Sequence, residues 1–291
     1  MNDQLTDPIE AARRSYAEEL RFTAHIRSRA VFTAFAAVPR ERFVGAGPWR
    51  VRSPMDMAEY WTTEDGDPRA VYHDVLIALD ETRQINNGQP SLWAYLLDQL
   101  DIGAGEHVLH LGCGTGYYTA VVAELAGPTG KITAVEIDAG LAEKARIALE
   151  PWSQITVSNA DGSTLSFERA DLIIASAGAT HPVTAWLDAL KPGGRLLFPM
   201  TATQRGAMLL VTREAEDSFA ACFLCQVGFI EFSGARDPDT GRRLATALAQ
   251  DWGETVQSLR RDNHAECRTC WLHGEGWCLS RRLPVAVRPQ A

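Results

Sequence analysis

The sequence has no long hydrophobic run, and none of its apolar stretches reaches the length of a transmembrane helix. The first residues, MNDQLTDPIE, carry acids and no apolar core, so no secretory signal is expected. Positive charge is scarce, because 28 Lys and Arg against 37 Asp and Glu leave a net charge of −9, which argues against a nucleic-acid partner. Six scattered cysteines do not form a secreted disulfide framework. These absences predict a cytoplasmic protein that binds neither nucleic acid nor a membrane.

What remains is ordinary for a globular protein, with 46% apolar and 22% charged residues. From about residue 90, segments that suit strands alternate with segments that suit helices. The predicted strands are HVLHL, KITAVEID, ITVSNAD, ADLIIAS and GRLLFPM, followed by AMLLVTRE and ACFLCQVGFIEFSG with no long helix between these two. This order predicts an α/β fold with a doubly wound, mostly parallel, seven-stranded sheet that ends in an antiparallel pair.

Segments on both sides are expected to add to this sheet. Two helices are predicted before Val38, and the tail is predicted to form a helix over about 241–261 and then a strand or hairpin. The chain is therefore expected to comprise N-terminal helices and a cover segment at 1–90, a cofactor-binding core at 91–235 and an extension at 236–291.

Three glycines, Gly112, Gly114 and Gly116, stand at alternate positions in HLGCGTGYY, directly after the first strand of the core. The spacing lacks the third glycine of G-x-G-x-x-G and the Gly-Lys-Ser/Thr ending of a phosphate loop. Ligands of open parallel sheets bind beyond the carboxyl ends of the strands, and glycines there permit close approach to the backbone. A cofactor without phosphate suits this segment, and S-adenosylmethionine is such a cofactor.

Two acids at later strand ends support an adenosine-type ligand. Glu136 ends the second strand, where a carboxylate can accept hydrogen bonds from ribose hydroxyls. Asp161, in the segment NADG, follows the third strand and can receive the adenine amine. Each acid alone is more often a solvated side chain, but their order and their positions at strand ends favour the ligand.

Two stretches resemble the protein-L-isoaspartate O-methyltransferase family: VFTAFAAVPRERFVG at 31–45, and the run from GEHVLHL to LLFP at 105–199. With YHD at 72–74, the resemblance covers most of residues 10–235. It implies a Rossmann-like class I methyltransferase that uses S-adenosylmethionine. It also implies cofactor binding near Gly112, Cys113, Gly114, Gly116, Glu136, Asp161 and Gly162. We further predict that His110, Ile137 and Ala175 belong to the cofactor site.

The chain departs from the family's pattern at the predicted acceptor side. His110 replaces the acid expected two residues before the first glycine, and NNGQPS replaces a Thr-Ile-Ser-x-Pro segment, with Gly88 in the place of the serine. The amides of that segment are candidates to orient a methyl acceptor: Asn86, Asn87 and Gln89. A carboxylate acceptor needs no general base because it is already ionised at neutral pH, whereas an amine or hydroxyl would need one, for which His110 and His181 are candidates.

Residues 45–70 form a long connection without a steady period, and it contains two tryptophans and a tyrosine. Long connections are usually lids, binding loops or disorder, and the aromatic residues disfavour disorder. We therefore expect an ordered cover on the acceptor side, anchored by Trp49, Tyr60 and Trp61.

Together these features predict a methyltransferase that acts on a carboxylate of a peptide, protein or small acid and is not a generic isoaspartyl repair enzyme. It is expected to be a monomer or homodimer. The alternative is a non-catalytic protein of the same fold that binds the cofactor and has a regulatory or partner-binding role. The altered NNGQPS segment favours this alternative, and the intact cofactor motifs favour the enzyme.

The tail contains HAECRTCWLH, which places His264, Cys267, Cys270 and His273 at tight spacing, with Cys278 nearby. Zinc prefers such ligands in tetrahedral sets. Against a metal, CWLHGEGWCLS alternates like a strand, and free cysteines are often buried. The strand pattern outweighs the spacing, so the sequence predicts no metal site.

Overall fold

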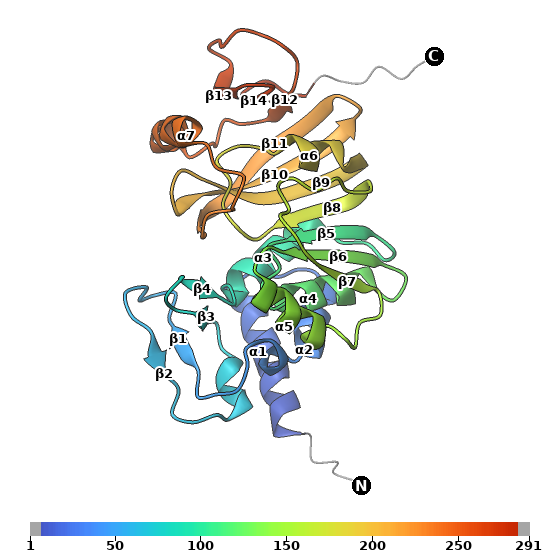
Figure 1. Ribbon diagram of the computed structural model, residues 1–291, viewed down its shortest axis with the longest axis vertical. Helices are drawn as coiled ribbons and strands as arrows, with labels where there is room; N and C mark the ends of the chain where they lie inside the picture. The colour runs from blue at the N-terminus through green and yellow to red at the C-terminus, as the bar shows by residue number, and fades with distance from the viewer. Residues whose placement is uncertain (1–6, 285–291) are drawn as a thin grey trace. The chain divides into compact units, whose positions relative to one another are not determined.

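The computed structural model describes residues 7–284 (Figure 1). The first six residues lie outside this range. They belong to MNDQLTDPIE, the segment from which no secretory signal is expected. The chain divides into two compact units: the first comprises residues up to 106 with 113–132 and 138–157, and the second comprises 107–112, 133–137 and the chain from 158 onward. None of the helices within 7–284 is both long enough and apolar enough to cross a membrane.

Helices make up much of the first unit. They are α1 (Pro8–Thr23), α2 (Arg29–Ala37), α3 (Pro90–Leu100), α4 (Tyr117–Ala126) and α5 (Ala139–Ala148). The helices begin where the sequence offers caps: the side chains of Asp7, Ser28 and Asp138 accept hydrogen bonds from backbone N–H groups in the first turns of α1, α2 and α5. The two helices predicted before Val38 are confirmed.

A small antiparallel sheet occupies the stretch between α2 and α3. Its strands are β1 (Arg50–Arg52), β2 (Trp61–Thr62), β3 (Leu76–Asp80) and β4 (Ile85–Asn86), in the order β2-β1-β3-β4, with the 3₁₀ turns η1 (Arg40–Phe43) and η2 (Pro68–Val71) beside them in the sequence. Strands of two or three residues are too short to show an alternating pattern. The connection at 45–70 therefore has regular structure that the sequence did not predict.

The three predicted anchors of this connection differ in their burial. Trp49 is buried, and its indole N–H donates to the carbonyl of Gly45 at 3.0 Å. Tyr60 packs on Arg52, whose guanidinium carbon lies 4.6 Å from the ring centroid. Trp61 is 55% exposed, so the prediction that it anchors the segment is wrong.

A ten-stranded sheet lies mainly in the second unit (Figure 1). Its strands are β5 (His107–Leu111), β6 (Lys131–Glu136), β7 (Ile155–Asn159), β8 (Ala170–Ala175), β9 (Leu190–Thr201), β10 (Arg205–Ala215), β11 (Ser218–Gly228), β12 (Ser258–Arg260), β13 (Cys270–Gly274) and β14 (Trp277–Ser280). The order is β13-β14-β12-β11-β10-β9-β8-β5-β6-β7. β8 pairs in parallel with β5 and β9, whereas the run from β9 to β13 is antiparallel.

The predicted α/β class is confirmed, and the sheet is partly parallel, but the predictions of a mostly parallel sheet and of seven strands are wrong, because the five pairings from β9 to β13 are all antiparallel. All seven predicted strands are present as β5 to β11. The tail adds β12, β14 and β13 beyond β11, so β11 is not the edge strand. An exposed edge offers unpaired N–H and C=O groups, and β12 pairs with the start of β11 at Phe219 and Ala220.

Two further helices belong to the second unit, α6 (Thr184–Asp188) and α7 (Pro238–Asp251). The tail helix was predicted to continue to about residue 261, and this is wrong. Trp252 (φ +49°) and Gly253 (φ +81°) take left-handed backbone conformations that end α7, and Asp251 accepts from the N–H of Gly253 at 2.9 Å. The segment after this turn supplies β12 instead.

Candidate functional site

The glycine segment between β5 and α4 turns the chain through left-handed backbone conformations. Gly112, Gly114 and Gly116 have φ values of +72°, +58° and +94°, which glycine adopts without steric cost. A Cβ on Gly116 would lie 2.7 Å from Leu149 Cδ1, so this glycine permits close packing at the start of α4. A Cβ on Gly112 or Gly114 would have no neighbour among the described residues nearer than 3.9 Å. The first two glycines therefore leave backbone that a ligand can approach.

One side chain in this segment has an unsatisfied polar group. Thr115 is 4% exposed, and within residues 7–284 its buried hydroxyl has no hydrogen-bond partner. Buried hydroxyls are nearly always paired in folded proteins. A ligand atom beside Gly114 can supply the partner, so the segment fits a bound cofactor. The sequence did not predict a role for Thr115, because a threonine between turn glycines has no distinctive pattern. The predicted residue Cys113, two positions earlier, is buried.

Glu136 is the last residue of β6, and Ile137 directly follows it in the second unit. Glu136 is buried, and its carbonyl accepts hydrogen bonds from the Ala160 N–H at 3.1 Å and the Asn159 side-chain amide at 2.9 Å. Ile137 is 52% exposed. The strand end therefore places a carboxylate directly before an exposed apolar side chain, which suits a ribose and a flat apolar ring.

The turn after β7 is held by its own side chains. The Asp161 carboxylate accepts from the N–H and hydroxyl of Ser163, at 2.8 and 2.7 Å. The carbonyl of Gly162 accepts from the indole N–H of the fully buried Trp186 at 2.8 Å, and a Cβ on Gly162 would lie 3.3 Å from Phe232 Cζ. Trp186 and Phe232 thus fix this turn, and only tertiary packing reveals them.

His110 and Ala175 lie inside the sheet. β5 and β8 pair in parallel, with His110 opposite Ile174 and Leu111 opposite Ala175. His110 is 1% exposed, its Nε2 lies 2.8 Å from Ser176 Oγ, and burial lowers its pKa to about 4. The imidazole of His110 is therefore neutral at pH 7. Ala175 is also wholly buried.

This burial makes the stability depend on pH. The unfolded chain protonates His110 below about pH 6.5, whereas the folded chain keeps it neutral down to about pH 4, so stability falls as the pH falls through this window. The His110 contribution is on the order of 3 kcal/mol. We expect urea unfolding to show this loss in the wild type and a shallower pH dependence in His110→Gln. Equal slopes in the two proteins would contradict a neutral buried histidine.

The acceptor segment predicted from the sequence lies in the first unit, and its amides shape their own loop. Asn86 accepts from the N–H of Gly88 at 2.9 Å. Asn87 is buried, and its side-chain oxygen accepts from Arg40 Nε at 3.1 Å. The Gln89 amide donates to Ser91 Oγ at 2.8 Å, at the start of α3.

Arg40 is a buried residue that joins this loop to the stretch before β3. Its side chain is 0% exposed, and it donates to the carbonyls of Val71 (2.9 Å), His73 (2.8 Å) and Val75 (2.8 Å) as well as to Asn87. Its guanidinium carbon also lies 5.9 and 5.7 Å from the ring centroids of Tyr16 and Tyr117. Its local sequence, VPRERFVG, contains no pattern that predicts this buried role.

Gly88 has no room for a side chain. Its φ is +77°, and a Cβ would lie 2.8 Å from Trp93 Nε1 and 2.9 Å from Tyr118 Cε2. These two rings stack with centroids 4.8 Å apart, and the Tyr118 hydroxyl donates to the Gly88 carbonyl at 3.1 Å. The glycine is therefore required by the fold of this loop.

The candidate residues divide between the two units. The first unit contains Asn86, Asn87, Gln89, Cys113, Gly114 and Gly116, and the second contains His110, Gly112, Glu136, Ile137, Asp161, Gly162 and Ala175. Within the second unit, backbone hydrogen bonds bring successive strand ends together: Gly112 to Val135 at 2.8 Å, Ala160 to Glu136 at 3.1 Å, and Ser176 to Leu111 at 2.8 Å. His181 also lies there, where burial lowers its pKa.

Known proteins match the chain over most of its length. The family model for protein-L-isoaspartate(D-aspartate) O-methyltransferase matches residues 12–237. Protein-L-isoaspartate O-methyltransferase 1 of Geotalea uraniireducens is 33% identical over 215 residues, covering 72% of this chain and 87% of the relative. The protein-L-isoaspartate O-methyltransferase of Brucella anthropi is 32% identical over 233 residues, covering 78% and 95%.

Solved structures show the same fold. A protein-L-isoaspartate O-methyltransferase aligns with a TM-score of 0.64 and 23% identity, over 81% of this chain and 69% of that one. A Plasmodium falciparum protein of the same named class, solved with S-adenosyl-L-homocysteine, aligns with a TM-score of 0.61 and 15% identity, over 76% and 98%. The prediction of an enzyme is confirmed over the non-catalytic alternative. The chain belongs to the protein-L-isoaspartate O-methyltransferase family and is an S-adenosylmethionine-dependent methyltransferase.

Proposed function

We propose that this enzyme methylates a carboxylate oxygen of a peptide, a protein or a small acid, and that generic isoaspartyl peptides are poor acceptors. The Gly88 geometry carries the second part of the proposal. The family resemblance places a serine there, whereas here the left-handed backbone and the Trp93 and Tyr118 rings exclude any side chain. A site built around a polar contact loses much of its activity when that contact is absent.

A carboxylate acceptor agrees with the bases that the chain offers. S-adenosylmethionine supplies a methyl group that is bonded to a positively charged sulfur, and the neutral thioether is a good leaving group. The residues of this chain then need only to align the acceptor, because a carboxylate is ionised at neutral pH and has no proton to lose. His110, one of the two candidate bases, is buried in the sheet, and burial lowers its pKa to about 4, so it is a weak base.

The proposal assigns cofactor contacts within each unit by itself. In the first unit, the backbone at Gly114 admits the cofactor, and the Thr115 hydroxyl gains a partner. In the second unit, the backbone at Gly112 and the Asp161–Gly162 turn can contact it, Glu136 accepts from the ribose hydroxyls, and the exposed Ile137 offers an apolar surface to the adenine.

The ribose assignment predicts weaker binding when the carboxylate is removed. Glu136→Ala should weaken S-adenosylhomocysteine binding by about 1.5–3 kcal/mol, which is roughly 10- to 150-fold in Kd, as for hydrogen bonds that involve a charged group. Isothermal titration calorimetry measures the change. Glu143→Ala, an exposed acid on α5 paired with Arg146, is the matched control and should bind as the wild type does. Wild-type affinity in Glu136→Ala would refute the assignment.

The acceptor proposal predicts a difference from the family's named activity. We expect kcat/KM for a generic isoaspartyl peptide to be at least about 100-fold below that of the preferred acceptor. A methyl-ester release assay over peptide and small-acid pools identifies that acceptor, with the Geotalea relative as the positive control for the isoaspartyl peptide. Turnover of this peptide at the rate of the control enzyme would overturn the proposal.

A further inference from the structure

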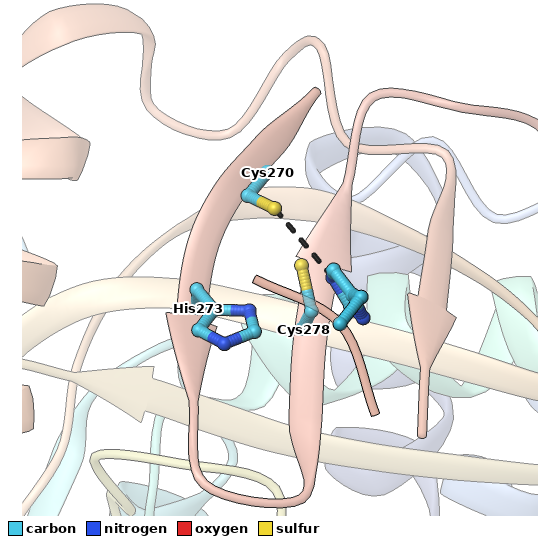
Figure 2. A group of neighbouring side chains, drawn as sticks. Cys270, His273 and Cys278 are labelled. Carbon is cyan, nitrogen blue, oxygen red and sulfur yellow. Dashed lines mark hydrogen bonds between the residues drawn. The ribbon is translucent and has the colours of Figure 1, made fainter. Parts of the chain in front are cut away.

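The C-terminal hairpin of β13 and β14 brings three potential metal ligands onto one face (Figure 2). His273 and Cys278 are directly opposite each other in the antiparallel register, so their side chains point to the same side. Cys270 is three residues before His273, which in a regular strand would place it on the other face. The register shifts by one residue between Cys270 and Leu272, and this bulge returns Cys270 to the face of His273.

The other face of the hairpin is anchored in the core of the second unit. Trp271, Leu272, Trp277 and Leu279 all belong to that apolar cluster. The hairpin therefore has a fixed inner face, and its opposite face gathers the two thiols and the imidazole. Cys270 is 8% exposed and Cys278 is fully buried, so both thiols are largely removed from water.

His264, from the loop before β13, completes a set of four. The potential ligand atoms of His264, Cys270, His273 and Cys278 all lie within 4.8 Å of one another, and His264 Nε2 is 3.6 Å from Cys270 Sγ. Zinc bonds of about 2.0–2.3 Å in a tetrahedron require ligand atoms about 3.3–3.8 Å apart. A small contraction of the set is enough to reach that geometry.

Hydrogen bonds around the set favour ligation. His264 Nδ1 lies 2.9 Å from the carbonyl of Asp262, which can only accept, so the proton is on Nδ1 and the Nε2 lone pair faces Cys270. The Cys267 N–H donates to Cys270 Sγ at 3.3 Å, which stabilises a thiolate. Within residues 7–284, the buried Nδ1 of His273 has no hydrogen-bond partner. Such a nitrogen calls for a ligand.

We propose that His264, Cys270, His273 and Cys278 bind one structural zinc ion. Two thiolates and two neutral imidazoles balance the charge of Zn²⁺, and tetrahedral sulfur–nitrogen sets select zinc over the harder cations. Four protein ligands leave no open position, so the ion ties the loop before β13 to the hairpin and takes no part in methyl transfer. The site lies beyond residue 237, outside the part of the chain that matches the family.

The zinc proposal differs from the sequence-based prediction in two ways. The sequence predicted no metal, and its candidate cluster contained Cys267 with Cys278 only nearby. In the structure Cys267 is exposed, and Cys278 takes its place because β14 lies against β13. Cys267 Sγ is still 3.7 Å from Cys270 Sγ, so the test must separate the two assignments.

Metal analysis of the full-length protein, purified with a thiol reductant, tests the site. We expect about one zinc per chain in the wild type. Co²⁺ added to metal-free protein should give the visible absorption and sulfur charge-transfer bands of tetrahedral thiolate coordination. Cys270→Ala and Cys278→Ala should each lose the zinc. Cys267→Ser, in the same loop, and Cys225→Ala, a half-buried cysteine of β11, should retain it.

Several results would overturn the proposal. These are a wild-type protein without zinc and without the cobalt bands, zinc that persists in both Cys270→Ala and Cys278→Ala, or zinc lost in Cys267→Ser but kept in Cys278→Ala. A Cys267–Cys270 disulfide in the reduced preparation, detected by mass spectrometry, would also count against it. If the alanine variants do not fold, the wild type decides: chelation should lower Tm, and Zn²⁺ but not Mg²⁺ should restore it. An unchanged Tm after complete zinc removal would refute a structural ion.

Discussion

Arg40→Met should lower the free energy of unfolding of the first unit by about 3–5 kcal/mol. Methionine has a similar length but no donors, so the buried carbonyl of Val71 and the part-buried carbonyls of His73 and Val75 would be left without their partner. Each unsatisfied buried acceptor costs about 1–3 kcal/mol before any relaxation. Arg40→Lys should recover little of the loss, because a single ammonium cannot reproduce the planar fork.

Urea unfolding combined with amide hydrogen exchange over residues 68–89 measures this effect. Arg42→Met is the matched control, because Arg42 lies in the same 3₁₀ turn η1 and donates to the Ala148 carbonyl at 2.6 Å from a partly exposed position. Its loss should be about 1 kcal/mol. If the two variants unfold at the same urea concentration, Arg40 does not hold these loops together.

The parts of the fold that the sequence predicted are those with long, regular patterns. The run HVLHL is buried at all five positions of β5, and the helices of the core are long enough for their period to show. The four strands of the small sheet and β12 have two to five residues, and the pairings of β1 with β3 and of β12 with β11 join residues more than twenty positions apart. Their formation depends on tertiary pairing, which a local pattern does not contain.

The candidate site shows the same division between local and tertiary information. The turn glycines and the position of Glu136 at a strand end follow from chain order alone. The contact between Arg40 and Asn87 joins residues 47 positions apart, and no spacing rule connects them. The presence of Cys278 in the tail cluster depends on the pairing of β14 with β13, and a one-residue bulge in β13 brings Cys270 to the same face. Local sequence therefore identified the segments, and packing determined which side chains meet.

The structure of the acceptor loop also limits what a mutation can restore. Gly88→Ser reintroduces the residue that the family resemblance places there, yet we expect a loss of stability of about 2–5 kcal/mol. A left-handed backbone costs a non-glycine residue about 1–2 kcal/mol. The overlap of the new Cβ with Trp93 and Tyr118 adds about 1–3 kcal/mol for overpacking.

Gly45→Ser separates the two contributions. Gly45 has φ +71°, close to the +77° of Gly88, but a Cβ there would have no described atom within 4 Å. Gly45→Ser should therefore lose only the backbone part, about 1–2 kcal/mol. Urea unfolding compares the two variants, and the methyl-ester assay should show no gain of isoaspartyl turnover in Gly88→Ser. A stable Gly88→Ser enzyme that methylates generic isoaspartyl peptides would mean that this loop accommodates the hydroxyl. The predicted loss of stability would then be wrong, while the inference that the missing hydroxyl restricts the acceptor range of the wild type and the assignment of the chain to the methyltransferase family would stand.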